Sequence, residues 1–355
     1  VRRMAFSTDK EKINRELARV EEFRRIHLGD EEFPVQQFID NRAALKKAEV
    51  EGAHLITEEV RGLQKSLDST RAILHFFRGE QAERYPFLAA LCKPVKVYPF
   101  VQDRIGKILN KQGQIRDNAS SELMQIRRKQ SELQGAVSRK LNQVLNRARK
   151  EGWVDADVVP TYRNDRPVIP VMAGNKRKLG GMIHDESASG RTVFIEPAEV
   201  VELSNEIREL GYSERREILR ILQDFTSDIR PYIPELLAVH DFLAQIDFIR
   251  ARVLFALRIG AVAPRVVPEQ VFDWKEAVHP LLYLAFRAEK REVVPLTFHL
   301  GGKNRILLIS GPNAGGKSVC LKTVGLLQYM LQCGMPVPCR EESVFGIFAG
   351  IFIDI

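Results

Sequence analysis

The sequence predicts a mainly α-helical protein with an α/β segment near its C-terminal end. Two long stretches, 118–150 and 198–229, repeat apolar residues at helical spacing, and a run of short β-type segments separates them. Over 305–332 an apolar run, a glycine-rich turn and a helical pattern follow one another. That is the order of a strand, a phosphate loop and a helix. At 355 residues, the chain is long enough for two or three domains with cores of their own.

The two long stretches are predicted to form helical arms. In 118–150, apolar side chains recur three, four or seven positions apart, which makes a seam for one partner helix. The pattern of 198–229 ends before Pro231, which cannot continue a helix. At about 1.5 Å per residue, the first arm would be about 45 to 50 Å long, more than a compact domain needs. A further helix is predicted over 236–257.

A small β element is predicted between the arms. Short strands are expected at 168–173, 181–184 and 192–195, and the segments between them contain the turn residues glycine, asparagine and serine. The arrangement resembles a clamp carried on a lever.

The first hundred residues are predicted to form a helical layer. The stretch 10–28 places its apolar residues on one face after a cap at Ser7 or Thr8, and 57–78 carries a second helical pattern. Neither stretch shows a chemical motif.

Composition limits the class of protein. The chain has 54 Lys and Arg against 46 Asp and Glu and a formal net charge of +8, which permits a polyanionic partner. Its four cysteines form no C-x-x-C pair, so we expect reduced thiols in the cytoplasm and no zinc site. No apolar run approaches the roughly 18 residues of a membrane span, and we expect no membrane partner. Because the sequence starts at Val1, we expect it to be a piece of a longer protein.

Positive charge concentrates on the first arm. Residues 119–150 hold eight Lys and Arg against two Glu, a net +6. One interpretation is a track for nucleic-acid phosphates that continues into the β element. Its candidate contacts are Arg127, Arg128, Lys129, Arg139, Lys140, Lys176, Arg177 and Lys178. Nearby aromatic residues are few, so bases are not expected to stack on an aromatic platform.

The alternative interpretation is a solvated helix face that pairs with the other arm. That arm supplies the acidic partners Glu199, Glu202, Glu206, Glu209, Glu214 and Glu217. The sequence alone leaves both interpretations open.

The glycine-rich turn matches the phosphate-loop pattern G-x-x-x-x-G-K-[ST]. Its glycines permit positive φ angles, so that successive backbone N–H groups point at phosphates, and the following helix adds its positive end. The predicted phosphate ligands are Gly311, Pro312, Asn313, Ala314, Gly315, Gly316, Lys317 and Ser318. Lys317 would reach the β and γ oxygens, and the Ser318 hydroxyl would hold Mg²⁺. The expected cofactors are therefore ATP and Mg²⁺, and the alternative is a glycine-rich turn with an incidental lysine.

These residues suggest a family. The stretch "GPNAGGKSVCLKTVG" after "LLIS" resembles the phosphate loop of the MutS ATPases. The stretches "RPVIPV", "GMIHDESASGRTVFIEPAEVVELSNEIREL" and "VHPLL" resemble the second bacterial subfamily of MutS proteins, over nearly the whole chain.

The resemblance implies a domain organisation. A helical core and lever would occupy 1–115, a clamp of long basic helix and β element 116–199, and returning lever helices 200–260. The N-terminal part of an ABC-type P-loop ATPase domain would occupy 261–355. Its Walker B carboxylates and an Smr nuclease domain would lie beyond Ile355, so we expect this chain to bind nucleotide without turnover.

The resemblance also implies activities and partners. Members of the subfamily are associated with ATP-dependent binding of branched or duplex DNA, suppression of recombination, DNA repair and endonuclease activity, and they form homodimers through the ATPase domain. The alternative is a ribosome-binding ATPase that rescues stalled ribosomes with the same clamp and contacts rRNA. A chromosome-structural ATPase is a third possibility, but it requires far longer coiled coils.

Individual residues can be carried over by their motifs. Asn313 would contact the γ-phosphate or its water. Val293 and Val294 match the region that packs on adenine, with core packing as the alternative. Val278 stands where the family usually has arginine, and Phe194-Ile195-Glu196, although it matches the Phe-x-Glu of mismatch readers, is expected to serve packing.

Overall fold

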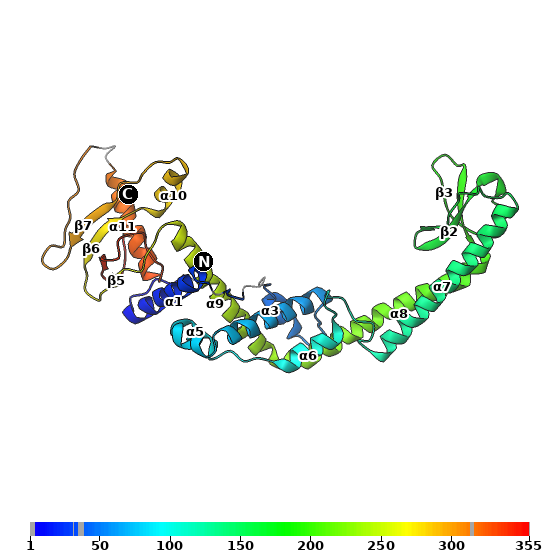
Figure 1. Ribbon diagram of the computed structural model, residues 1–355, viewed down its shortest axis with the longest axis horizontal. Coiled ribbons are helices and arrows are strands. Elements are labelled where there is room, and N and C mark those ends of the chain that lie inside the picture. The colour runs from blue at the N-terminus through cyan, green and yellow to red at the C-terminus, as the bar shows by residue number, and fades with distance from the viewer. Residues whose placement is uncertain (1–3, 31, 35–38, 313–315, 355) are drawn as a thin grey trace. The chain divides into compact units, whose positions relative to one another are not determined.

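The computed structural model describes residues 4–30, 32–34, 39–312 and 316–354 (Figure 1). The fold is mixed α/β and mainly helical, with two small sheets. The chain divides into two compact units. The first comprises Val1–Asp40, Lys65–Val97 and Pro234–Ile355, and the second comprises Asn41–Gln64 and Tyr98–Ile233.

Two long helices form the centre of the second unit. Helices α7 (Ser121–Lys150) and α8 (Ala198–Ile229) run side by side, with the unit's sheet at one end (Figure 1). The predicted arms are thus confirmed, and α7 begins three residues later than its pattern because the Ser120 hydroxyl caps it by accepting the Leu123 N–H at 3.0 Å. Helix α8 ends at Ile229, before a 3₁₀ turn that contains Pro231. The seam is apolar and includes buried Leu123, Val137 and Val144.

The predicted β element is a four-stranded antiparallel sheet in the order β1-β2-β4-β3. Its strands are β1 (Thr161–Arg163), β2 (Arg166–Met172), β3 (Gly181–Glu186) and β4 (Thr192–Pro197). Alternate residues of β2 and β4, such as Val171 and Ile195, share a buried core with Val144 and Ala148 of α7. The three predicted strands are confirmed, and the short strand β1 was not predicted.

Shorter helices complete the second unit. They are α2 (Arg42–Ala48) and α6 (Pro99–Ile108), together with the beginning of α3 (Thr57–Phe76), which continues into the first unit. The loop from Leu109 to Ser120 joins α6 to α7, and an isolated bridge between Leu109 and Ile115 closes it into a turn.

The helical part of the first unit contains α1 (Lys10–Leu28), α4 (Glu80–Arg84), α5 (Pro86–Cys92) and most of α9 (Ile233–Arg258). The expected cap of α1 at Ser7 or Thr8 is wrong, because the Asp9 carboxylate accepts the N–H groups of Glu11 and Lys12 at 2.9 and 3.2 Å. A carboxylate at this position also favours the positive end of the helix.

The second sheet of the first unit has the order β5-β8-β6-β7. Its strands are β5 (Arg265–Val266), β6 (Phe272–Ala277), β7 (Leu296–Leu300) and β8 (Val344–Phe345), and helices α10 (Pro280–Ala288) and α11 (Lys317–Gln332) belong to the same region. Trp274 is fully buried against Phe345, with 4.4 Å between ring centroids, and Leu327 and Leu331 of α11 join the same core.

The strand predicted at 305–310 is wrong for this structure. The segment has no strand geometry, and the side chains of Ile306 and Leu308 are 89% exposed. An apolar run forms a strand when a neighbouring strand satisfies its backbone groups. Among the described residues, no strand pairs with this segment.

Candidate phosphate loop and basic surface

The phosphate-loop sequence leads directly into α11. Gly316 is the residue before the helix and has φ 85° and ψ 9°, a left-handed conformation that glycine adopts without strain, and Gly311 has φ 151°. Lys317 starts the helix, and its Nζ donates to the carbonyl oxygens of Pro312, at 2.8 Å, and of Gly311. The ammonium group thus folds back onto the loop that precedes it. Asn313, Ala314 and Gly315 lie outside the described residues.

The other residues predicted to contact nucleotide are accessible. Ser318 is exposed in the first turn of α11. Val294 is 90% exposed in the segment before β7, and Val293 is half-buried beside it. Over the described part of the chain, no group of three or more His, Cys, Asp or Glu residues could hold a metal ion. A Mg²⁺ ion at Ser318 would therefore depend on phosphate oxygens and water for its other ligands.

His279 is a residue of this unit whose environment the sequence did not reveal. It precedes α10, and its Nδ1 accepts the Leu282 N–H at 3.4 Å. Burial and the positive charge of Lys322 on α11 lower the pKa of His279. The imidazole is therefore neutral near pH 7, as its capping role requires.

The four cysteines are free thiols, as predicted. Burial raises the pKa of each thiol, that of Cys339 to about 11 and that of Cys92 to about 12. Cys320, two residues after Ser318 in α11, has a raised pKa as well. Since the thiolate is the reactive form, these cysteines are poor nucleophiles at neutral pH.

Ion pairs between α7 and α8 occupy part of the predicted basic track. Arg127 pairs with Glu214 and Asp117, Lys129 with Glu206, and Arg147 with Glu199. The pairs with Glu214, Glu206 and Glu199 are the ones that the alternative interpretation expected from the second arm, whereas Asp117 lies in the loop before α7. Within α7, Arg128 pairs with Glu132. Lys140 donates to the Glu199 carbonyl at 3.3 Å, and Arg139 is exposed with no acidic partner among the described residues.

Several cations of the β element have no carboxylate partner in the described residues. Lys176, Arg177 and Lys178 form an exposed turn in the crossover between β2 and β3. The crossover begins beside Arg191, because the Ala173 N–H donates to the Arg191 carbonyl at 2.9 Å. Within the described ranges, none of these four side chains has an acidic partner. The free positive charge of this region thus lies on the β element and also on α7, where Arg139, Lys140, Arg149 and Lys150 have no acidic partner in the described residues either.

A buried carboxylate fixes the base of the sheet. Glu196 is fully buried and lies 2.7 Å from His184 Nε2, and Arg166 Nη1 lies 3.4 Å from its Oε1. Arg166 also donates to Asn205 on α8 at 2.8 Å. Three strands and α8 are thereby joined, so the Phe-x-Glu stretch serves packing and hydrogen bonding at the start of the arm, as predicted. Two further cations, Arg163 and Arg166, are held by carboxylates and do not add to the free charge.

The comparisons with known proteins agree with this description. No family model matches the chain. Among curated proteins, it is 35% identical over 324 residues to "Endonuclease MutS2" of Geobacillus sp. (strain WCH70), which covers 91% of this chain and 40% of that protein. It is 37% identical over 316 residues to the protein of the same name from Pelotomaculum thermopropionicum (89% and 39%). The Exiguobacterium sibiricum protein is 35% identical over 359 residues (100% and 44%).

The fold and the sequence define a mixed α/β protein that combines a phosphate-loop motif with a paired-helix arm. Since the similarity extends over nearly all of its residues, the chain belongs to the MutS2 family. It spans less than half the length of these curated relatives. No helix in the described part is long and apolar enough to cross a membrane.

Proposed function

We propose that the chain is the part of a MutS2-type ATPase that couples ATP binding to the binding of branched or duplex DNA. The observation that carries the proposal is the exposed basic group of the β element, Lys176, Arg177, Lys178 and Arg191, which has no acidic partner in the described residues. We call this group the basic tip. Relatives that carry the name "Endonuclease MutS2" support a nucleic-acid partner.

Electrostatics favours the basic tip over the paired cations of α7 as a contact. A cation that is already paired with a carboxylate gains less from a phosphate, because the existing pair must be broken or shared. Arg127, Lys129 and Arg147 have such partners on α8. Arg139 and Lys140, which are exposed on α7, would extend the contact along the arm.

ATP would bind at the phosphate loop with Mg²⁺ on Ser318. The helix N-terminus at Lys317 and the glycines before it provide N–H groups for phosphate oxygens. In this proposal α7 and α8 form a clamp, the adjoining helices form the lever, and dimerisation uses the ATPase domain. We also propose that this chain alone binds nucleotide without turnover.

The salt dependence of DNA binding tests the proposal. The affinity of the chain for a four-way junction and for a duplex of equal length is measured from low to physiological salt. A variant with Lys176, Arg177, Lys178 and Arg191 replaced by Gln should lower the log–log slope by about 2 to 4, since each lost phosphate contact removes about 0.9. The control replaces Lys10, Lys12, Arg15 and Lys303, four exposed cations of the first unit, by Gln and should keep the slope.

The same variants distinguish the ribosome alternative. Co-sedimentation with ribosomes that depends on the basic tip, together with absent DNA binding, would replace DNA by rRNA as the partner. An unchanged slope in the folded basic-tip variant would show that the charge of the β element does not contact nucleic acid.

A further inference from the structure

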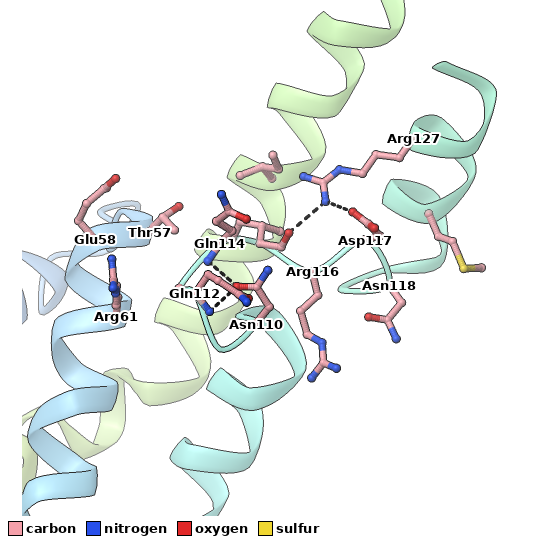
Figure 2. Close-up of a pocket in the computed structure, with 14 residues that line it drawn as sticks. Thr57, Glu58, Arg61, Asn110, Gln112, Gln114, Arg116, Asp117, Asn118 and Arg127 are labelled. Carbon is pink, nitrogen blue, oxygen red and sulfur yellow. Dashed lines mark hydrogen bonds and ion pairs between the residues drawn. The ribbon is translucent and has the colours of Figure 1, made fainter. Parts of the chain in front are cut away.

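The second unit contains a large hollow beside the loop that joins α6 to α7 (Figure 2). Its volume is about 1030 Å³, and its wall combines this loop with the first turns of α3 and α7 and with Ile218 of α8. All of its lining residues belong to the same unit. None of them belongs to the phosphate loop or to the basic tip.

The wall presents side-chain amides that the protein itself does not use. Asn110 Oδ1 accepts the N–H groups of Gln112 and Gln114 at 3.0 and 2.9 Å, which fixes the turn and leaves the Asn110 amide nitrogen free. The side chains of Gln112, Gln114 and Asn118 have no hydrogen-bond partner in the described structure. Each amide offers both a donor and an acceptor, as the edges of nucleobases do.

Arg61 provides a free cation at the rim. It is exposed and has no acidic partner within the described residues. Its side chain lies against Gly113, which has φ +81°, so closely that a Cβ on Gly113 would be 2.4 Å from Arg61 Cδ and 2.6 Å from Nε. Gly113 thus provides both the turn conformation and the space that holds Arg61 in place. Figure 2 shows the amides of Asn110, Gln112 and Gln114 between Arg61 on one side and Arg116 and Arg127 on the other.

The remaining charges leave the hollow positive. Asp117 is paired with Arg127, whose guanidinium also donates to the Ile115 carbonyl at 3.0 Å. Arg116 uses one nitrogen for the Gly106 carbonyl at 2.7 Å and has no carboxylate partner in the described part of the chain. Glu58 is the remaining carboxylate of the lining, so the lining holds two carboxylates against three arginines.

We propose that this hollow binds a nucleoside phosphate. Arg61 would hold the phosphate by charge-assisted hydrogen bonds, and the free amides would hydrogen-bond the edge of the base. Met124, which is half exposed, and Ile218 offer an apolar surface for the face of the base. The volume corresponds to the upper end of ordinary small-molecule sites. Because the wall is rich in amides and arginines, a polar anionic ligand fits it better than an apolar one.

The ligand can be a free nucleotide or the terminal nucleotide of a strand, and the experiment includes both. Calorimetric titrations use AMP, GMP, CMP and UMP, the four matching nucleosides, inorganic phosphate, and a 5′-phosphorylated tetranucleotide with its unphosphorylated form. The protein is the 355-residue chain with Lys317→Ala, so that the phosphate loop does not contribute. We expect saturable binding of at least one monophosphate or of the phosphorylated tetranucleotide, and about tenfold weaker binding of the unphosphorylated counterpart.

Two variants test the assigned residues. Arg61→Gln should weaken binding about tenfold, and Gly113→Ala should do so as well because its Cβ displaces Arg61. Arg71→Gln, an exposed arginine farther along α3 in the first unit, is the matched control and should leave affinity unchanged. The proposal is overturned if no phosphorylated ligand binds the parent chain at millimolar concentration, or if Arg61→Gln and Arg71→Gln bind equally well. Neither result depends on DNA binding by the basic tip.

Discussion

Arg127 on α7 and Glu214 on α8 form an ion pair that joins the two long helices, with 2.8 Å between Nε and Oε1. About a quarter of each side chain is exposed. The same guanidinium donates to the Ile115 carbonyl and pairs with Asp117, so one residue holds both α8 and the loop that leads into α7. A half-buried cation with several acceptors serves structure, and its removal leaves those acceptors without a partner.

Replacement of Arg127 by Gln should destabilise the second unit. Loss of a largely buried charge that holds three acceptors should lower the free energy of unfolding by about 1 to 3 kcal/mol. Urea denaturation followed by circular dichroism measures the change. Arg128→Gln is the control, since its pair with Glu132 is exposed and should contribute less than about 0.5 kcal/mol.

A double-mutant cycle with Glu214→Gln identifies the pair as the cause. Because both residues take part in one interaction, the double variant should lose less than the sum of the two single losses. Equal losses for Arg127→Gln and Arg128→Gln would contradict the structural role of Arg127.

Glu22 of α1 makes a different kind of contact in the first unit. Its side chain is buried and accepts the N–H groups of Phe87 and Leu88, in the first turn of α5, at 3.1 and 2.8 Å. A carboxylate from one helix thus caps the start of another, where unpaired N–H groups need acceptors. Burial raises the pKa of Glu22 in spite of these hydrogen bonds and the nearby Arg25 and Arg19.

The raised pKa of Glu22 predicts the sign of a pH dependence. The folded state binds the proton more tightly than the unfolded state, so this group contributes most to stability below the ordinary pKa of glutamate. That contribution decreases as the pH rises from the ordinary pKa through the raised pKa of the folded state. The free energy of unfolding of the parent, relative to Glu22→Gln, should therefore fall over this window. Urea titrations of both proteins at a series of pH values measure it, and parallel curves would show that the carboxyl group does not titrate differently on folding.

Sequence patterns predicted the elements in which an apolar pattern repeats over many residues and the elements that are bounded by clear turn residues. The arms α7 and α8 repeat an apolar seam over many turns, and the strands of the β element are bounded by residues such as Gly174 and Gly190. The strand at 305–310 failed because a strand depends on its neighbours, which a local pattern cannot supply. The predicted caps of α1, Ser7 and Thr8, lie two and one residues before the observed cap at Asp9. Sequence patterns place helix ends only to within one or two residues.

The division of charge could not be predicted from composition. The sequence gives eight basic residues in 119–150, but only the geometry shows that Arg127 and Lys129 face glutamates of α8 while Lys176 and Arg177 do not. Likewise, Arg61 and Gly113 are about fifty positions apart, and no local pattern indicates that one rests on the other. The phosphate loop was visible in the sequence because its function requires a contiguous motif.

The final prediction concerns Lys317. In the structure its Nζ donates to the Pro312 carbonyl at 2.8 Å and to the Gly311 carbonyl, so the ammonium lies over the loop. Phosphate oxygens would replace these neutral acceptors and gain a stronger, charge-assisted hydrogen bond. We therefore expect Lys317→Ala to weaken binding of a fluorescent ATP analogue with Mg²⁺ by at least about tenfold, equivalent to about 1.4 kcal/mol.

Lys322→Ala is the matched control for this measurement. Lys322 is an exposed lysine of the same helix, five positions after Lys317, and it has no contact with the loop in the described residues. Its substitution should leave the affinity for ATP within about twofold, since it removes the same charge from α11 without removing a phosphate ligand. If both variants bound the analogue as tightly as the parent, the glycine-rich turn would carry an incidental lysine, and nucleotide binding by this chain would have to be sought at another site.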